Sequence, residues 1–168
     1  MTFKPVLTAC LALALGISPG AWAQRIVDIP EWKESEAPPP PAFDFGKLVT
    51  FEASPGSSLV FGVDPAAVSI SGSDSLVRYV MVATSASGAR NVLYEAIRCS
   101  TAEVKTYARY SADGHWSPVD SPEWRPLFGN RSASHALRFA QAGACDNTAP
   151  ATSVQALVQQ LKSPNLKR

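Results

Sequence analysis

Between residues 47 and 118, short hydrophobic stretches rich in β-branched and aromatic side chains alternate with short polar segments. Small polar residues and glycine separate these stretches, a pattern typical of strands joined by tight turns. The connections are too short to hold crossover helices, so neighbouring strands must pair antiparallel. We therefore predict an antiparallel meander of about five strands over residues 67–118, preceded by short N-terminal strands. The expected strands cover residues 47–52, 59–63, 67–70, 76–84, 91–99 and 104–110, with a last short one around Trp116.

Beyond residue 122 the apolar residues recur at helical rather than strand spacing. Ser132 or Ser134 is expected to cap a first helix that ends at Gly143. A second helix is predicted to begin at Ser153 and to end before Pro164. Strands followed by helices predict an α+β fold whose C-terminal helices pack on one face of the sheet.

The first 23 residues have the order of a secretory signal peptide. Lys4 precedes an apolar run over residues 6–17, and an Ala-x-Ala site follows, which predicts cleavage before Gln24. The run of about 12 residues is too short to span a bilayer as a helix. Lipidation at Cys10 is the alternative, but it leaves too few residues before the cysteine for the apolar region that a lipoprotein signal needs.

The remaining chain divides by composition. Residues 24–42 form a proline-rich arm, and the four consecutive prolines at 38–41 favour an extended polyproline helix. A spacer and a docking tract for a partner both fit such an arm. Residues 43–162 are predicted to form a single α+β domain, and residues 163–168 a C-terminal tail.

Composition excludes several classes of protein. The chain has 168 residues, 46% hydrophobic and 17% charged, which suits one globular domain. Loss of the leader removes one lysine and no acid, so the mature chain carries equal numbers of acidic and basic residues. A neutral chain without a basic patch argues against nucleic acid as a partner. No transmembrane segment is expected in the mature chain.

Only two cysteines, Cys99 and Cys145, remain after cleavage. In an exported domain two cysteines are most simply one disulfide. Two separate buried thiols are the alternative. A redox catalyst is disfavoured because the common Cys-x-x-Cys spacing is absent.

The motifs of known active sites are absent from the sequence. Nucleophile-elbow, P-loop and Rossmann patterns are missing, so no catalytic residue and no cofactor is assigned. The two histidines, His115 and His135, lie in different predicted elements, and no metal site is expected. Glu95 is the one acid inside the three longer predicted strands, and it breaks the alternation of residues 91–99, which marks a bulge, an edge or a functional residue.

An aromatic and arginine-rich group on the predicted meander is the best candidate for a recognition surface. Arginine offers a planar fork for anions, and tyrosine offers rigid contact area with a hydroxyl. Alternatively, Glu95 forms a structural salt bridge with a cross-strand arginine. The candidate ligand- or partner-binding residues are Tyr94, Glu95, Arg98, Tyr107, Arg109 and Trp124.

Several stretches resemble the cryptic-neisserial-protein-like family of small exported proteins from Gram-negative bacteria, whose function is uncharacterised. The likeness extends over residues 29–162 and is most specific at 94–99 and 107–110. The resemblance implies a periplasmic setting and a single compact domain, and it brings no catalytic residues. The stretches that carry it are residues 77–89, 91–99, 105–110, 122–125 and 143–145.

The sequence thus favours a periplasmic domain that binds a small ligand or an envelope protein without catalysis. A small envelope hydrolase with Glu95 or His135 as general base is the first alternative. A purely structural envelope component is the second.

Overall fold

The computed structural model describes residues 31–51, 58–129 and 134–163. The predicted leader over residues 1–23, its cleavage site, Ser132 and residues 164–168 of the predicted tail lie outside the described residues.

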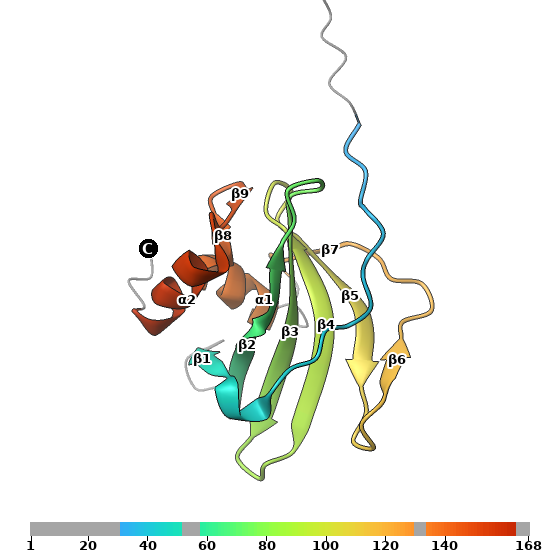
Figure 1. Cartoon of the computed structure of the whole chain (residues 1–168), viewed down its shortest axis with the longest axis vertical. Coiled ribbons are helices and arrows are strands. Elements are labelled where there is room, and N and C mark those ends of the chain that lie inside the picture. Colours follow the sequence, from blue (N-terminus) through green and yellow to red (C-terminus); the bar gives the residue numbers. More distant parts are fainter. Residues whose placement is uncertain (1–30, 52–57, 130–133, 164–168) are drawn as a thin grey trace, which may run out of the picture. The chain divides into compact units, whose positions relative to one another are not determined.

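An antiparallel sheet forms the centre of the domain, and its strands lie side by side in the order of the sequence (Figure 1). The predicted α+β meander is therefore confirmed. A two-residue strand, β7 (Arg125–Pro126), pairs with the part of β5 that β6 leaves open. The strands are β1 (Val49–Phe51), β2 (Leu59–Ile70), β3 (Leu76–Ser85), β4 (Arg90–Arg98), β5 (Glu103–Tyr110) and β6 (Trp116–Pro118).

The stretches 59–63 and 67–70, predicted as two strands, belong to the single strand β2. The pairing of β2 with β3 shifts register between Val63 and Val68. The Asp64 carboxylate accepts a hydrogen bond from the backbone N–H two residues further on, 3.0 Å away. The segment between Val63 and Val68, which begins with Asp64, is therefore a local irregularity within one strand rather than a turn.

The C-terminal elements lie together on one face of the sheet, called the helix face below (Figure 1). As predicted, the second helix begins after Ser153, whose hydroxyl accepts from the backbone N–H of Ala156. A 3-10 turn, η1 (Phe45–Lys47), precedes β1. The C-terminal elements are α1 (Ser134–Phe139), the π-helical turn η3 (Ala140–Ala144), β8 (Cys145–Asp146), β9 (Ala149–Pro150) and α2 (Val154–Lys162).

Alternation along the strands sends side chains into two apolar layers. On the helix face, Tyr79 and Ile97 pack with Phe139 of α1 and Leu157 of α2 in the larger core. The opposite face, called the arm face, has a smaller buried layer that includes Tyr94. Both faces of the sheet are therefore covered.

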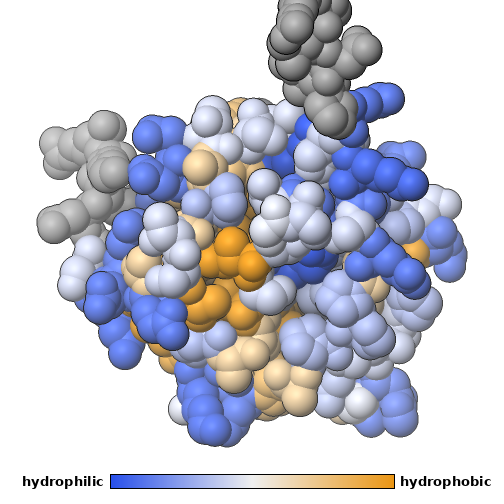
Figure 2. All heavy atoms as spheres, turned by 45° about the horizontal axis from the view of Figure 1, so that its top comes forward, coloured by the Kyte–Doolittle hydropathy of each residue, from blue (hydrophilic) through white to orange (hydrophobic). Residues whose placement is uncertain are grey.

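The surface is mostly polar, but Figure 2 shows apolar atoms gathered at the centre of one face. Two large apolar side chains are more than half exposed, Val60 at 55% and Phe128 at 62%. Among the described residues, no helix is long and apolar enough to cross a membrane.

Candidate functional site

Residues 32–42 of the predicted arm, called the docked arm below, lie along the arm face (Figure 1). The indole N–H of Trp32 donates to the backbone carbonyl of Asp74 at 2.8 Å. The Arg98 guanidinium lies 3.7 Å from the centre of the Trp32 ring, a cation–π contact. These contacts attach the start of the docked arm where β4 ends.

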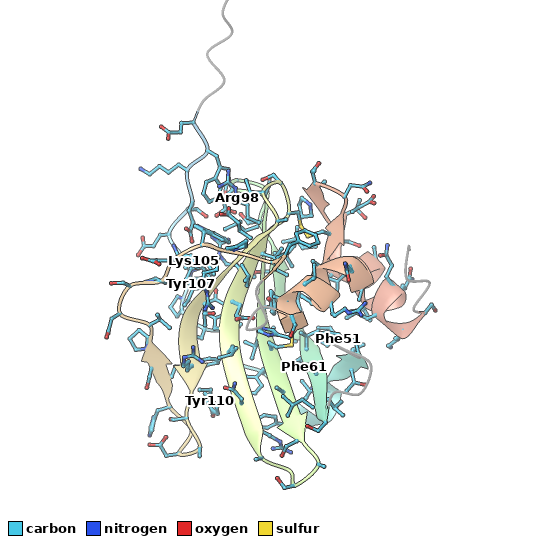
Figure 3. All side chains as sticks on the ribbon, turned by 180° about the vertical axis from the view of Figure 1, so that it is seen from behind. Phe51, Phe61, Arg98, Lys105, Tyr107 and Tyr110 are labelled. Carbon is cyan, nitrogen blue, oxygen red and sulfur yellow. A yellow bond between two sulfur atoms is a disulfide. The ribbon has the colours of Figure 1, made fainter. Side chains whose placement is uncertain are left out.

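The carboxylate of Glu34 is the main polar anchor of the docked arm. It accepts hydrogen bonds from Lys105 Nζ at 2.9 Å, the Tyr107 hydroxyl at 2.6 Å and the Trp124 indole at 3.1 Å. Burial alone would raise the pKa of Glu34, but these bonds outweigh it and lower the pKa. Figure 3 shows Arg98, Lys105 and Tyr107 at the same end of the sheet, beside the docked arm.

A buried ion pair lies beneath the docked arm. Arg78 and Asp74 meet at 2.6 Å, with side chains 4% and 0% exposed, and Ser35 of the docked arm hydrogen-bonds the same carboxylate. Burial raises the pKa of Asp74, yet the hydrogen bonds from Arg78 and Ser35 prevail and hold it well below its usual range. The docked arm therefore covers this ion pair and adds the hydrogen bonds of Ser35 to it.

On the helix face, Glu95 is the centre of a second buried network. Its carboxylate is 1% exposed and accepts from the Tyr79 hydroxyl at 3.1 Å and the Thr106 hydroxyl at 2.9 Å. The Nε2 atom of His135 lies 2.8 Å from it, and because a carboxylate accepts, this ring nitrogen carries the hydrogen. Burial, and then the neighbouring carboxylate, raise the pKa of Tyr79, which stays a donor.

A cavity of about 560 Å³, called the histidine cavity, opens beside this network between the sheet and α1. Phe61 stacks on the His135 ring with planes 5° apart, and Met81 and Leu93 add apolar walls. The polar part of its lining includes Asn91, Thr106, Arg109, Arg125, Ser134 and His135.

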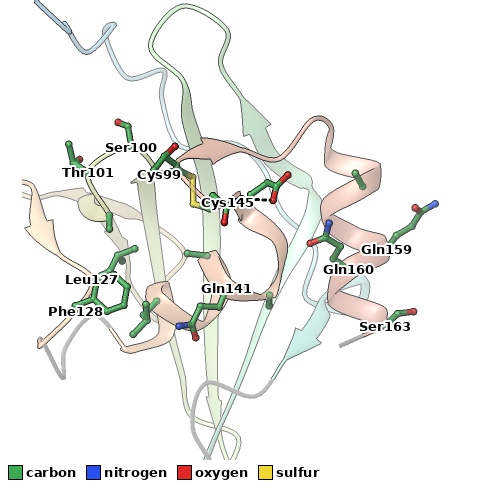
Figure 4. Close-up of a pocket in the computed structure, with 18 residues that line it drawn as sticks. Cys99, Ser100, Thr101, Leu127, Phe128, Gln141, Cys145, Gln159, Gln160 and Ser163 are labelled. Atoms are coloured by element: carbon green, nitrogen blue, oxygen red, sulfur yellow. Dashed lines mark hydrogen bonds between the residues drawn. A yellow bond between two sulfur atoms is a disulfide. The ribbon is translucent and has the colours of Figure 1, made fainter. Parts of the chain in front are cut away.

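Cys99 and Cys145 form a disulfide with Cα atoms 5.7 Å apart, as predicted from the sequence. It lies in the wall of a cavity of about 970 Å³, called the disulfide groove. Figure 4 shows the disulfide near the middle, Leu127 and Phe128 on one side and Gln160 of α2 on the other. Among the described residues, Asp146 is the one ionisable side chain in the lining.

No three histidine, cysteine or acidic side chains of the described residues come close enough together to hold a metal ion. The two cavities differ mainly in the charge of the side chains that line them. Arginine and histidine line one of them, and carboxamides and apolar side chains line the other.

The model of one protein family, the CNP1-like family, matches residues 27–162. The chain belongs to the CNP1-like family. No curated protein and no solved structure matches the chain significantly.

The six candidate residues of this CNP1-like chain fall on two faces of the sheet. Tyr94, Arg98, Tyr107 and Trp124 share the arm face with the docked arm. Glu95 and Arg109 line the histidine cavity on the helix face, together with His135. On β4, the alternation of side chains separates Tyr94 and Arg98 from Glu95. On β5, the pairing with β4 shifts register and leaves Tyr107 as the extra residue of a bulge, so Tyr107 and Arg109 lie on opposite faces. That any of the six binds a ligand or a partner stays a prediction.

Glu95 pairs with His135, Tyr79 and Thr106, and none of its three partners is an arginine. The salt-bridge alternative is therefore replaced by a network that includes a helix residue 40 positions away. Strand alternation identified Glu95 as unusual, but alternation carries no information about which helix covers a strand.

Sequence reasoning in this CNP1-like chain missed the carboxamides of the disulfide groove, Gln141 and Gln160. Exposed glutamine in an amphipathic helix is the ordinary pattern of a solvated face. The one available signal was the predicted disulfide, which had to bring residues around Cys99 next to those around Cys145.

Proposed function

We propose that this CNP1-like protein is exported to the periplasm and there binds an uncharged segment of polypeptide in the disulfide groove, without catalysing a reaction. The main support for this proposal is the lining of that groove. It combines apolar side chains with carboxamides and has a single ionisable side chain among the described residues.

The leader pattern and the disulfide support export. A cleavable apolar leader directs a chain across the inner membrane, and the periplasm is oxidising enough for a disulfide to form and persist. The bond between Cys99 and Cys145 suits that compartment.

The chemistry of the groove suits a neutral peptide. Each carboxamide offers donors and an acceptor, as a peptide group does, and Gln141, Gln160 and Asn147 supply three of them. Leu127 and Phe128 provide apolar contact area beside these amides. A volume of about 970 Å³ is large enough for a few residues of extended chain.

The groove is tested with a pool of capped, uncharged hexapeptides added to the isotope-labelled protein, with backbone amide NMR signals as readout. We expect signals of the groove residues to shift in the parent protein. Gln160→Lys should weaken the shifts because it places a cation in the groove. Gln155→Lys is the matched control, since it makes the same change on α2 outside the groove lining. The proposal fails if no groove signal shifts, or if both variants bind like the parent.

Export is tested separately by fractionating cells that produce the full chain and weighing the product. We expect a periplasmic protein that begins at Gln24 and is two hydrogens lighter than its reduced form. A product that retains Met1, or that has two free thiols in the periplasm, would contradict the proposal.

One observation favours a hydrolase as the second candidate. Glu95 and His135 are in contact at 2.8 Å beside an open cavity, the arrangement in which a carboxylate orients a general base. Yet Glu95 already accepts from two buried hydroxyls, which suits a structural network. We therefore rank catalysis below binding.

The two candidates are separated by assaying p-nitrophenyl esters of acetate and phosphate with the parent and with His135→Gln. Binding without catalysis predicts equal background rates for the two proteins. Turnover by the parent that disappears in His135→Gln would favour the hydrolase.

A further inference from the structure

The histidine cavity holds positive charge that no described carboxylate neutralises. Arg109 and Arg125 line it, and neither forms an ion pair among the described residues. Arg78, Arg98 and Lys105, in contrast, each have an acidic partner on the arm face.

Glu95 is the one acid among the described residues that line the cavity, and its carboxylate is bonded to other partners. Its oxygens accept from Tyr79, Thr106 and His135, and the side chain is 1% exposed. Arg125 reaches this network only through the Thr106 hydroxyl, at 3.4 Å. Both guanidinium groups are therefore available to a ligand.

Arginine is well matched to one class of ligand. Its planar fork forms paired, charge-assisted hydrogen bonds with carboxylate or phosphate oxygens, and these are stronger than bonds between neutral groups. Asn91 and Ser134 add neutral donors to the same lining. Phe61 and Leu93 supply an apolar wall, and about 560 Å³ suits a small organic molecule.

We propose that the histidine cavity binds a small organic anion, with its carboxylate or phosphate group against Arg109 and Arg125 and its apolar part against Phe61 and Leu93. The site is separate from the disulfide groove and does not depend on peptide binding there.

The proposal is tested by calorimetric titration of the oxidised protein with phenyl phosphate, benzoate and benzamide. Phenyl phosphate and benzoate separate the two anionic groups on the same ring, and benzamide is a neutral analogue of similar shape. We expect at least one of the anions to bind, and benzamide to bind about tenfold more weakly or not at all. Failure of both anions to bind, or equal binding of benzamide, would overturn the proposal.

Variants locate the site. Arg109→Gln and Arg125→Gln should each raise the Kd of the bound anion about tenfold, because each removes charge-assisted hydrogen bonds. Lys162→Gln is the matched control, since it removes one positive charge at an exposed position outside the cavity and should leave the Kd within about twofold. Arg109 is exposed, so its variant decides the outcome even if Arg125→Gln fails to fold. Unchanged affinity in Arg109→Gln would refute the assignment.

Inorganic phosphate tests the apolar half of the proposal. It lacks a ring to contact Phe61 and Leu93 and should bind more weakly than phenyl phosphate. Equal affinities of phosphate and phenyl phosphate would contradict the proposed contact of the ligand with Phe61 and Leu93.

Discussion

Glu95 and Asp74, two of the three carboxylates that are buried among the described residues, are satisfied in different ways. Asp74 has a guanidinium partner and lies beneath the docked arm. Glu95 relies on two hydroxyls and an imidazole, one of its donors coming from each of β3, β5 and α1. A single side chain thus connects three elements, and its removal leaves buried donors without an acceptor.

Replacing Glu95 with alanine is expected to lower the free energy of unfolding by about 2–4 kcal/mol, because the Tyr79 hydroxyl loses its acceptor in a dry environment. Urea denaturation measures the loss. Glu123→Ala is the matched control, an exposed acid whose removal should cost no more than about 0.5 kcal/mol. Similar losses in both variants would mean that the network contributes little.

Gly143 is required by local geometry. Its φ is +134°, and a Cβ there would lie 2.8 Å from Cβ of Gln160. Gly143→Ala should therefore lower the free energy of unfolding by about 1–3 kcal/mol. Gly72→Ala is the control, because its φ is ordinary and nothing lies within 4 Å. Equal denaturation midpoints for the two variants would contradict the argument.

At the scale of elements, alternation and turn residues predicted the strands and their order well. The contacts between elements were harder to predict from the sequence. The contacts of the docked arm follow no repeating pattern: Trp32 and Ser35 both bond Asp74, which precedes β3, whereas Glu34 bonds Tyr107 of β5. Such contacts arise from complementarity between specific side chains, which a pattern of hydrophobic and polar positions does not encode.

The contact between the docked arm and the sheet is expected to weaken at acid pH. The pKa of Glu34 lies below its ordinary value of 4.5, so its carboxylate stabilises docking above that pH, and this stabilisation is lost as the pH falls below it. The Tm should therefore drop more steeply on acidification in the parent than in Glu34→Gln, in thermal scans from about pH 7 to about pH 3.

Glu36→Gln is the control for this experiment, because Glu36 is an exposed acid on the same docked arm. It should keep the parent's pH dependence. If Glu34→Gln also keeps the pH dependence of the parent, the Glu34 carboxylate does not hold the docked arm against the sheet.

At the scale of the whole molecule, the disulfide joins the end of the central strand β4 to the segment between the two C-terminal helices. It ties the sheet to its helical cover and also shapes the wall of the disulfide groove. Stability and the geometry of the groove are thereby coupled in one covalent bond.

Replacing Cys99 and Cys145 together with alanine should lower the free energy of unfolding by about 3–4 kcal/mol, because a closed loop of this length restricts the unfolded chain. Urea midpoints of the variant and of the oxidised parent measure the difference. The parent after full reduction should behave like the variant. Equal midpoints for the variant and the oxidised parent would show that the bond does not stabilise the domain.

The sequence alone determined the order of strands and helices, their antiparallel pairing, the disulfide and the family. The order and the pairing depend on apolar stretches and short connections, and the disulfide depends on a count of cysteines. The family depends on a likeness that is most specific at residues 94–99 and 107–110. All of these are readable along the chain. Only the tertiary structure decided that Glu95 meets His135, that the docked arm lies on the arm face, and that two cavities of different charge exist. Those features need residues up to 90 positions apart to come together, and the positions that meet depend on side-chain packing across layers.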